Sequence, residues 1–528
     1  MSMAAAANLT GTVESATASR GLVRSTWLIA ALTMVSRVLG LVREIAFSYY
    51  FSTSELLSAF RIAFMIPNLA RRLFGEGALS AATIPILTQT LETSGEEASR
   101  RFVGALVVAL AAVLLAATAL AEVIIALWAA VQPDPALSFA AIMMPFMAMV
   151  CLTAILGGVL NVRGHFAIPA VGPVLLNAAI ILAGVVGSSV LGLDDAPLMR
   201  LICYGVLIGG IVQLVLTIAA LQTARFAPIL RWAWRDAQLQ RVMGLMAPMV
   251  LGLSAVQINT LSDYVIAYIF VTQDGERIGP AVLGYAQFLY QLPLGVFGIS
   301  IATVIFPLLS QKAAQDDRRG VAAITTEGFR LSLFIALPAS IGLMFVARPL
   351  VATLYERGDF GADDTARVAW ALIYYSIGIA GYFSQHIFIR VFYAMHDSRT
   401  PARIALGMVA ANLCLNLVLV FIMEERGLAL STSLCACVQV VWLASRLRRR
   451  LPELHCLDLT RGCVRSVIAT ALMAGALALT HAAIGSAPRG SDTLELVILL
   501  VVGVGTFGLA AWALRMPELS LLFRRNSP

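Results

Sequence analysis

Several arginines lie within apolar sequence in the first part of the chain, where a charged side chain is costly. This set and its polar neighbours are Ser36, Arg37, Arg43, Asn68, Arg71, Arg72 and Glu76. If a helix enters a bilayer near Glu55, Arg71 lies about 24 Å deep in a hydrocarbon layer about 30 Å thick. An arginine at a helix centre costs about 2.5–3.5 kcal/mol on insertion scales. The pattern predicts a water-filled cavity lined by arginine, beside a helix broken at Pro67 and Gly75.

The chemistry that such a cavity favours is the binding of an anion. The planar guanidinium group of arginine forms paired hydrogen bonds with phosphate. Holding several unpaired arginines for structure alone would be expensive. Two other interpretations remain open for these residues. Arg71 and Arg72 extend to the cytoplasmic interface, or the arginines form a structural ion-pair network with Glu44 and Glu76.

A second polar group interrupts the apolar sequence of the second half. It combines one carboxylate with two amides and a hydroxyl, from Asp263, Asn412, Asn416 and Thr432. Asn412 and Asn416 are four residues apart, so they share one face of a helix. These oxygen ligands suit Na⁺ or a carboxyl group that carries a proton. The alternative is ordinary hydrogen bonding between membrane helices.

The composition places both groups in a membrane protein. The 528 residues are 59% hydrophobic and 13% charged, whereas a soluble protein has about 25% charged residues. Arginine supplies almost all the positive charge because Lys312 is the only lysine, so the net charge of +7 indicates topology and buried sites, not nucleic-acid binding. We find no hydrolase triad, phosphate loop or HExxH motif, and therefore predict a transporter without a resident cofactor.

Apolar stretches of membrane-spanning length recur along the whole chain. They predict an all-α polytopic protein with about 14 transmembrane helices. The expected spans are 25–51, 56–92 (broken near Arg71), 102–131, 136–160, 167–191, 197–222, 240–271, 280–310, 326–347, 367–394, 402–423, 427–446, 464–485 and 493–514. Arginines collect in alternate loops, which predicts that both termini are cytoplasmic.

An internal repeat suggests how these spans are grouped. The segment from Pro67 to Pro85 resembles the segment from Pro293 to Pro307. Six helices in each copy would give parallel repeats around a central cavity, followed by two additional helices. The expected segments are a disordered cytoplasmic tail at 1–24, an N-terminal lobe at 25–222, a basic cytoplasmic linker at 223–239, a C-terminal lobe at 240–446, two additional helices at 464–514 and a cytoplasmic tail at 515–528.

The motifs that contain these arginines resemble the MurJ (MviN) family of bacterial lipid II flippases, within the multidrug/oligosaccharidyl-lipid/polysaccharide exporter superfamily. The segments that carry the resemblance are 36–44, 66–80, 160–170, 285–307 and 392–393. The resemblance covers about residues 25–515. It implies that Arg37, Arg43 and Arg71 line a cationic cavity for a lipid-linked pyrophosphate, with Arg72, Ser36, Asn68 and Glu76 beside them. It also implies that the last two helices hold a polyprenyl tail, and that the Asp263 group supplies cation coupling with Na⁺ or a proton.

The resemblance predicts a flippase for lipid II, an undecaprenyl-pyrophosphate-linked glycopeptide, in the bacterial cytoplasmic (inner) membrane. We expect a monomer whose partners are this substrate and membrane lipids, with no nucleic acid. Alternatives are a flippase for another polyprenyl-pyrophosphate-linked saccharide, a drug exporter of the superfamily, or a non-transporting scaffold of cell-wall synthesis. A drug exporter for cations should have an acidic cavity, and a scaffold should tolerate loss of the arginines.

The chain departs from the family pattern at three positions. Ser58 stands where an acid is common, Met65 where a base is common, and Phe288 where arginine is usual. Glu55 and Arg61 precede the first two positions by three and four residues, which keeps them on the same helix faces. We predict that Glu55 and Arg61 replace the displaced pair at an outer gate. Ordinary interfacial charges near the end of the span are the alternative.

Overall fold

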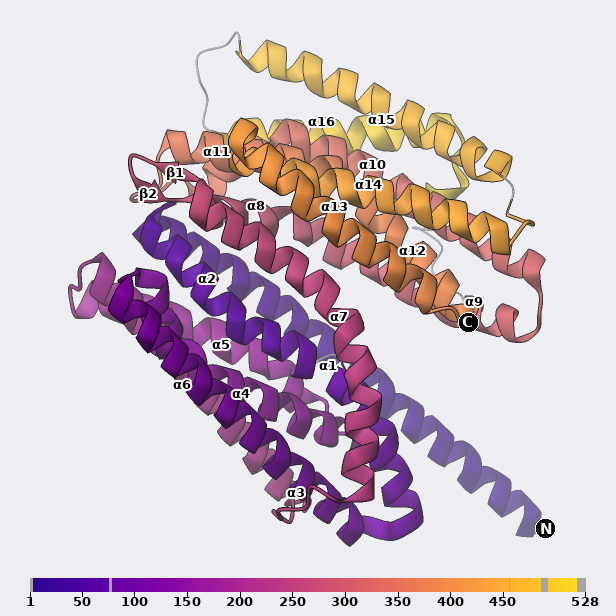
Figure 1. Cartoon of the computed structure of the whole chain (residues 1–528). Coiled ribbons are helices and arrows are strands. Elements are labelled where there is room, and N and C mark those ends of the chain that lie inside the picture. Colours follow the sequence, from indigo (N-terminus) through magenta and orange to yellow (C-terminus); the bar gives the residue numbers. More distant parts are fainter. Residues whose placement is uncertain (1–2, 76–77, 455, 486–491, 520–528) are drawn as a thin grey trace. The chain divides into compact units, whose positions relative to one another are not determined.

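The computed structural model describes residues 3–75, 78–454, 456–485 and 492–519. Its elements are helices apart from one short hairpin, as Figure 1 shows. Within the described ranges, 10 helices are long and apolar enough to cross a membrane. The hydrocarbon of a bilayer offers no hydrogen-bond partners, and a helix satisfies its backbone N–H and C=O groups internally. The chain forms two compact units: unit 1 contains Met1–Phe47 and Ala59–Ser254, and unit 2 contains Ser48–Ser58 and Ala255–Pro528.

Unit 1 is built from the first helices of the chain, with α4 packed against both α3 and α6, and α5 packed against α6. The elements that lie wholly or partly in this unit are α1 (Met3–Phe51), α2 (Glu55–Ala70), the π-helical turn η1 (Arg71–Gly75), α3 (Ala78–Val131), α4 (Pro135–Val162), α5 (Ala167–Val185), the π-helical turn η2 (Val186–Val190), α6 (Asp195–Thr223) and α7 (Ala237–Phe270). A left-handed Gly95, with φ of 81°, kinks α3.

Unit 2 contains the remaining elements. They are β1 (Thr272–Gln273), β2 (Glu276–Arg277), α8 (Gly279–Pro293), the π-helical turn η3 (Leu294–Gly298), α9 (Ile299–Ala314), α10 (Arg318–Tyr355), α11 (Ala362–Ile377), α12 (Ile379–Ala394), α13 (Arg399–Met423), α14 (Glu425–Arg450), α15 (Cys456–Gly485) and α16 (Asp492–Ala513). The hairpin pairs Thr272 with Arg277 in antiparallel register. Asp274 and Gly275 both have positive φ, as a tight two-residue hairpin turn requires.

The last two helices pack against α10 within unit 2. Phe334 of α10 is buried with Ala469 of α15 and Ala511 of α16. A second cluster joins Val346 to Leu477 and Leu499 on the same helices. The extra helices therefore share an apolar core with the helices of this unit.

Two expected segments differ from the helices in the structure. Helix α1 begins at Met3, so helix extends through the part of 1–24 for which we expected no regular structure. The expected span 367–394 is two helices, α11 and α12, separated at Gly378. The backbone of Gly378 lies so close to Ser433 that a Cβ atom would be 2.8 Å from its Cα atom. This close approach explains why glycine stands at the break.

The division between the units also falls elsewhere than at the linker 223–239. It lies within α7, between Ser254 and Ala255. Hydrogen bonds explain why the start of α7 belongs with unit 1: Gln238 Nε2 donates to Thr90 Oγ1 at 2.9 Å, and Arg241 Nη1 donates to Gln89 Oε1 at 3.2 Å.

The two proline segments of the predicted repeat have similar local structures. Pro67 lies near the end of α2 and is followed by η1, whereas Pro293 ends α8 and is followed by η3. Proline removes a backbone donor from the helix, and a π-helical turn is one way in which a helix accommodates the disruption. The break that we predicted beside Pro67 is therefore present, and its counterpart lies in unit 2.

Candidate anion and cation sites

Glu44 is the centre of the charged cluster in unit 1. Its side chain is 2% exposed, and its two carboxylate oxygens accept hydrogen bonds from different arginines. Arg43 Nη2 donates to Oε1 and Arg61 Nη2 donates to Oε2, each at 2.7 Å. One carboxylate therefore neutralises two guanidinium groups only in part. The cluster keeps a net positive charge inside the apolar unit.

Asn177 of α5 completes this cluster, although the sequence analysis did not assign it a site role. Arg43 Nη1 donates to its Oδ1 atom at 2.9 Å. The Asn177 amide nitrogen donates to the backbone oxygen of Ser36 at 3.3 Å, so it also holds α5 against α1. The only indication of this role in the sequence is that Asn177 is an amide within an apolar helix.

Arg37 and Arg72 have different surroundings from Arg43. Arg37 is half-buried on α1, one helical turn and a half before Arg43, and the residues that the structure describes provide no hydrogen-bond or ion-pair partner for its side chain. Arg72 is exposed. Glu76, which we predicted beside these residues, lies outside the described residues.

Arg71 lines a cavity of about 320 Å³ in unit 1, bounded largely by α4, α5 and α6. It lies at the first position of η1, and its Nε atom donates to Asn68 Oδ1 at 3.0 Å. Arg71 is the only formally charged residue among the described residues that line this cavity. The wall includes Pro173 of α5, four residues before Asn177, so the cavity that Arg71 lines and the contact of Arg43 with Asn177 involve neighbouring turns of the same helix.

Gln213 of α6 is a further polar residue in the wall of this cavity that sequence reasoning missed. It is 7% exposed, and its Nε2 atom has no hydrogen-bond partner among the described residues. Gly172 permits the close approach of this side chain, because a Cβ atom there would lie 3.0 Å from Gln213 Oε1. The cavity thus combines a cation with two amides, Asn161 and Gln213, and has no lining carboxylate in the part of the chain described.

The gate residues have separate partners. Arg61 of unit 1 pairs with Glu44, as described above, whereas Glu55 belongs to unit 2 and lies 3.8 Å from Arg277. Ser58, which replaces the acid common at this position, accepts a hydrogen bond from the backbone N–H of Ala281 at 3.2 Å. Each residue therefore has a contact that the sequence did not indicate, and the gate itself stays a prediction.

The polar group predicted in the second half is assembled within unit 2. Asn416 Nδ2 donates to Asp263 Oδ1 at 2.5 Å, and Thr432 Oγ1 donates to Oδ2 at 3.2 Å. Asn412 lies beside them, and turning over its amide would place its nitrogen 2.9 Å from Asp263 Oδ1. These residues come from α7, α13 and α14. Sequence spacing predicted the pair on α13, whereas only the fold brings Asp263 and Thr432 to it.

Asp263 is a buried carboxylate, 5% exposed, without a cationic partner among the described residues. Its contacts are amides and hydroxyls, and Asn412 and Asn416 are also buried, at 1% and 0% exposed. An uncompensated carboxylate in an apolar bundle is costly, so a bound cation or a proton would stabilise it. The donor set is all oxygen and nitrogen with one charge, which fits Na⁺ or a proton better than a transition metal.

The turn between α1 and α2 is bound to the start of α11 within unit 2. Ser52 Oγ donates to Asp364 Oδ2 at 2.8 Å, and Thr53 donates to the other carboxylate oxygen. Asp364 also accepts the backbone N–H of Gly361 and so caps its own helix. The same turn is held on its other side by Tyr285, whose hydroxyl donates to the Ser52 carbonyl at 3.0 Å.

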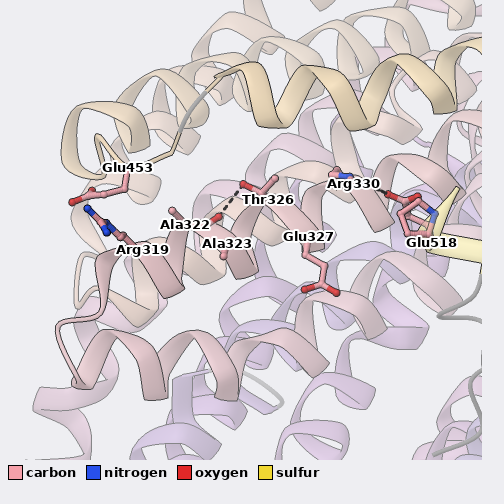
Figure 2. A pocket seen from close by; sticks show the side chains of 9 residues that line it. Arg319, Ala322, Ala323, Thr326, Glu327, Arg330, Glu453 and Glu518 are labelled. Carbon is pink, nitrogen blue, oxygen red and sulfur yellow. Dashed lines mark hydrogen bonds and ion pairs between the residues drawn. The ribbon is translucent and has the colours of Figure 1, made fainter.

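Figure 2 shows a second cavity, of about 480 Å³, in unit 2. It lies at the start of α10 near Glu453 and Glu518, and Arg330 pairs with Glu518 at 2.7 Å. Its described walls carry three glutamates and two arginines. This charge balance does not favour pyrophosphate, whereas the cavity that Arg71 lines has a purely positive formal charge.

Comparison with known proteins identifies the family to which this chain belongs. A family model described as "Lipid II flippase MurJ" matches residues 47–487, which is most of the chain. The chain belongs to the MurJ family. The resemblance that we inferred from the arginine motifs is therefore confirmed. Proteins of the MurJ family are flippases, which agrees with our expectation of a transporter and not an enzyme.

Curated relatives match over most of their length. The lipid II flippase MurJ of Burkholderia cenocepacia is 32% identical over 446 residues, covering 81% of this chain and 84% of the relative. A probable lipid II flippase MurJ of Vibrio cholerae is 31% identical and covers 87% and 89% of the two chains. One from Rhizobium tropici is 28% identical and covers 96% of both.

Solved structures support the fold. Lipid II flippase MurJ in an inward closed conformation matches with a TM-score of 0.76 and 25% identity, covering 94% of this chain and 100% of that one. A multidrug resistance MATE family transporter in an inward-facing conformation matches with a TM-score of 0.66, 14% identity and coverage of 81% and 98%. The predicted all-α polytopic fold is confirmed, and the predicted count of about 14 helices is consistent with it. The MATE likeness supports the fold alone.

Proposed function

We propose that this protein translocates lipid II from the inner to the outer leaflet of the bacterial cytoplasmic membrane by alternating access. Relatives that this chain matches over most of their length are named lipid II flippases. The observation that carries the chemical part of the proposal is the charge excess in unit 1. Arg43 and Arg61 share a single carboxylate, and Arg37 has no partner among the described residues.

Arg37, Arg43 and Arg71 are the residues that we propose bind the pyrophosphate of the substrate. Each of them supplies guanidinium donors from a largely apolar unit, where a charge-assisted hydrogen bond is stronger than in water. Arg43 retains a buried Nε atom without a hydrogen-bond partner among the described residues. Binding a pyrophosphate would offset the uncompensated charge and satisfy such donors. Ser36, Asn68 and Arg72 lie beside these groups, and Asn68 fixes the orientation of Arg71 through its Nε atom.

Asp263, Asn412, Asn416 and Thr432 are the residues that we propose couple transport to Na⁺ or to protons. A cation that binds the Asp263 carboxylate would remove the cost of burying it. Because Asn416 and Thr432 now donate to that carboxylate, a bound Na⁺ would require their oxygen atoms to turn toward the ion. Binding would thereby change contacts among α7, α13 and α14, which is how an ion alters a helical equilibrium.

The experiment that tests the function is rescue of a bacterium depleted of its own lipid II flippase. We expect the gene to restore growth, and the variant Arg71→Ala to fail at normal membrane abundance. Arg71→Lys should be impaired as well, because a point charge does not replace a planar fork. Arg200→Ala is the matched control, since Arg200 is an exposed arginine on α6 of the same unit.

The outcomes separate the proposal from its alternatives. Failure of the unaltered, correctly inserted protein to rescue would contradict lipid II transport and favour another polyprenyl-pyrophosphate-linked saccharide. Full rescue by Arg71→Ala would contradict the role of that arginine. Rescue that survives loss of Arg37, Arg43 and Arg71 together would favour a scaffold, which does not need to bind the headgroup.

A further inference from the structure

The connection between α6 and α7 exposes large apolar side chains. Leu230 is 67% exposed, Trp232 is 69% exposed and Trp234 is 38% exposed. The two tryptophan rings lie 5.5 Å apart in an edge-to-face arrangement. No helix or strand includes residues 224–236, so these side chains project from an irregular segment of unit 1. Such exposure is costly in water, since burial of a large apolar side chain contributes about 1.5–3 kcal/mol.

This connection is nevertheless held firmly against α3. The backbone N–H of Ile229 donates to the Arg100 carbonyl at 3.0 Å, and Arg100 Nε donates to the Ala227 carbonyl at 2.7 Å. Arg231 Nε donates to the Arg101 carbonyl at 3.3 Å. Figure 1 shows the connection beside α3. The tryptophans are therefore presented by a segment with a fixed position.

Gly104 makes this close approach possible. A Cβ atom at Gly104 would lie 1.8 Å from the carbonyl oxygen of Ile229, closer than any real contact. On the preceding side, Phe226 is 1% exposed and lies under the guanidinium of Arg163 at 5.4 Å. The inner side of the connection is thus packed against unit 1, whereas the side chains of Leu230, Trp232 and Trp234 are exposed.

The position of the connection along α3 indicates what covers these side chains. It contacts α3 at Arg100 and Arg101, directly before the apolar run that begins at Phe102. That basic pair marks the polar end of a membrane-spanning segment. Tryptophan is enriched at this level, because its ring is apolar and its N–H remains hydrated.

Charge identifies the kind of lipid. Arg225 and Arg235 are exposed, and neither side chain has a hydrogen-bond or ion-pair partner among the described residues. Arg231 in the same segment pairs with Asp236. Each basic residue near an anionic membrane surface contributes about 1 kcal/mol of attraction. An aromatic pair flanked by two uncompensated arginines therefore fits an anionic surface better than a zwitterionic one.

We infer that residues 225–235 form an interfacial anchor that inserts Leu230, Trp232 and Trp234 into a leaflet and gathers anionic phospholipids through Arg225 and Arg235. The anchor goes beyond the proposed flippase activity and does not depend on it. Because the segment is hydrogen-bonded to α3 and leads directly into α7, it fixes the depth of unit 1 in the bilayer at this end.

The test uses tryptophan fluorescence of the full chain in lipid vesicles. The chain has seven tryptophans, so the signal of the anchor is the emission lost in the double variant Trp232→Ser/Trp234→Ser. Vesicles contain equal fractions of phosphatidylglycerol and phosphatidylcholine, and in each experiment one of these lipids is brominated on the acyl chain near the headgroup. We expect brominated phosphatidylglycerol to quench the anchor signal about twofold more than brominated phosphatidylcholine.

Matched variants separate the charge from the aromatic contact. Arg225→Gln/Arg235→Gln should make the two brominated lipids equally effective, while the anchor signal stays quenched. Trp128→Ser is the control, because Trp128 is a 60% exposed tryptophan at the other end of α3 and has none of these arginines beside it. The emission lost in that variant should show no preference between the two lipids.

Three results would overturn the inference. Equal quenching by both lipids in the unaltered chain would contradict the recruitment of anionic lipid. Protection from both lipids together with strong quenching by acrylamide in the water would show that the tryptophans are merely hydrated. Protection from the lipids and from acrylamide would show that another protein surface or a second copy covers them. Vesicle quenching requires no transport, so failure here would leave the flippase proposal intact.

Discussion

At the scale of single residues, anion binding in unit 1 depends on arginines that outnumber the carboxylates beside them. Glu44→Gln removes the one carboxylate that Arg43 and Arg61 share. Removing one member of a buried ion pair costs about 3–5 kcal/mol, so we expect a clear fall in the thermal unfolding temperature of the purified protein. Glu97→Gln is the control, because Glu97 is 69% exposed and pairs with Arg101 at the surface, where the loss should be below about 1 kcal/mol.

Asp263 gives a second prediction at this scale. Asp263→Asn keeps the size of the side chain and removes the charge that a cation would neutralise. We expect it to abolish the dependence of lipid II transport on Na⁺ or on pH and to leave headgroup binding intact. Asp274→Asn, at an exposed hairpin position, is the matched control. Transport by the unaltered protein that is indifferent to both Na⁺ and pH would contradict the coupling proposal.

At the scale of elements, Asp364 connects the α1–α2 turn to α11. Asp364→Ala removes the acceptors of Ser52, Thr53 and the Gly361 N–H together. Hydrogen bonds to a charged group contribute about 1.5–3 kcal/mol each, so hydrogen exchange should increase in the α1–α2 turn and in the first turn of α11. Asp363→Ala removes a neighbouring, exposed acid from the same helix end. Equal exchange in the two variants would show that the helix dipole, not the contact with the turn, matters.

The break between α11 and α12 gives a second prediction for an element. Gly378→Ala would place its Cβ atom 2.8 Å from Ser433 Cα, so the helix must shift and we expect a loss of about 1–3 kcal/mol in unfolding free energy. Gly342→Ala on α10 meets no atom within 4 Å and should be neutral or slightly stabilising. A similar unfolding temperature for both variants would show that the close approach is not needed.

The elements also show what sequence can predict in this protein. Apolar runs predicted the helices because hydrocarbon demands about 20 apolar residues per span, and Pro67 predicted the break at η1. The need for glycine at position 378 was not predictable, since the close contact is with Ser433 of α14, 55 residues away in the sequence. The hairpin at 272–277 was missed as well, although Asp274-Gly275 is a recognisable turn signal.

At the scale of the whole molecule, the sequence indicated which residues belong to the sites better than it indicated which residues contact one another. The arginine motifs identified the family, and the amides on α13 identified half of the Asp263 group. It did not predict that Arg61 would pair with Glu44, or that Asn177 would bind Arg43, because these contacts join helices that only folding brings together. The cytoplasmic location of both termini and the monomeric state stay predictions, which reporter tags at each end and the mass of the purified protein can check.

The central claim is that the arginines of unit 1 bind the pyrophosphate during translocation. Its most direct test measures the fraction of lipid II that reaches the outer leaflet of reconstituted vesicles, with Arg37→Ala, Arg71→Ala and the control Arg200→Ala at equal protein content. Losing a charge-assisted contact of about 1.5–3 kcal/mol should slow translocation about 10- to 150-fold in the first two variants and leave the control unchanged. Translocation by Arg71→Ala at the rate of the unaltered protein would contradict the account.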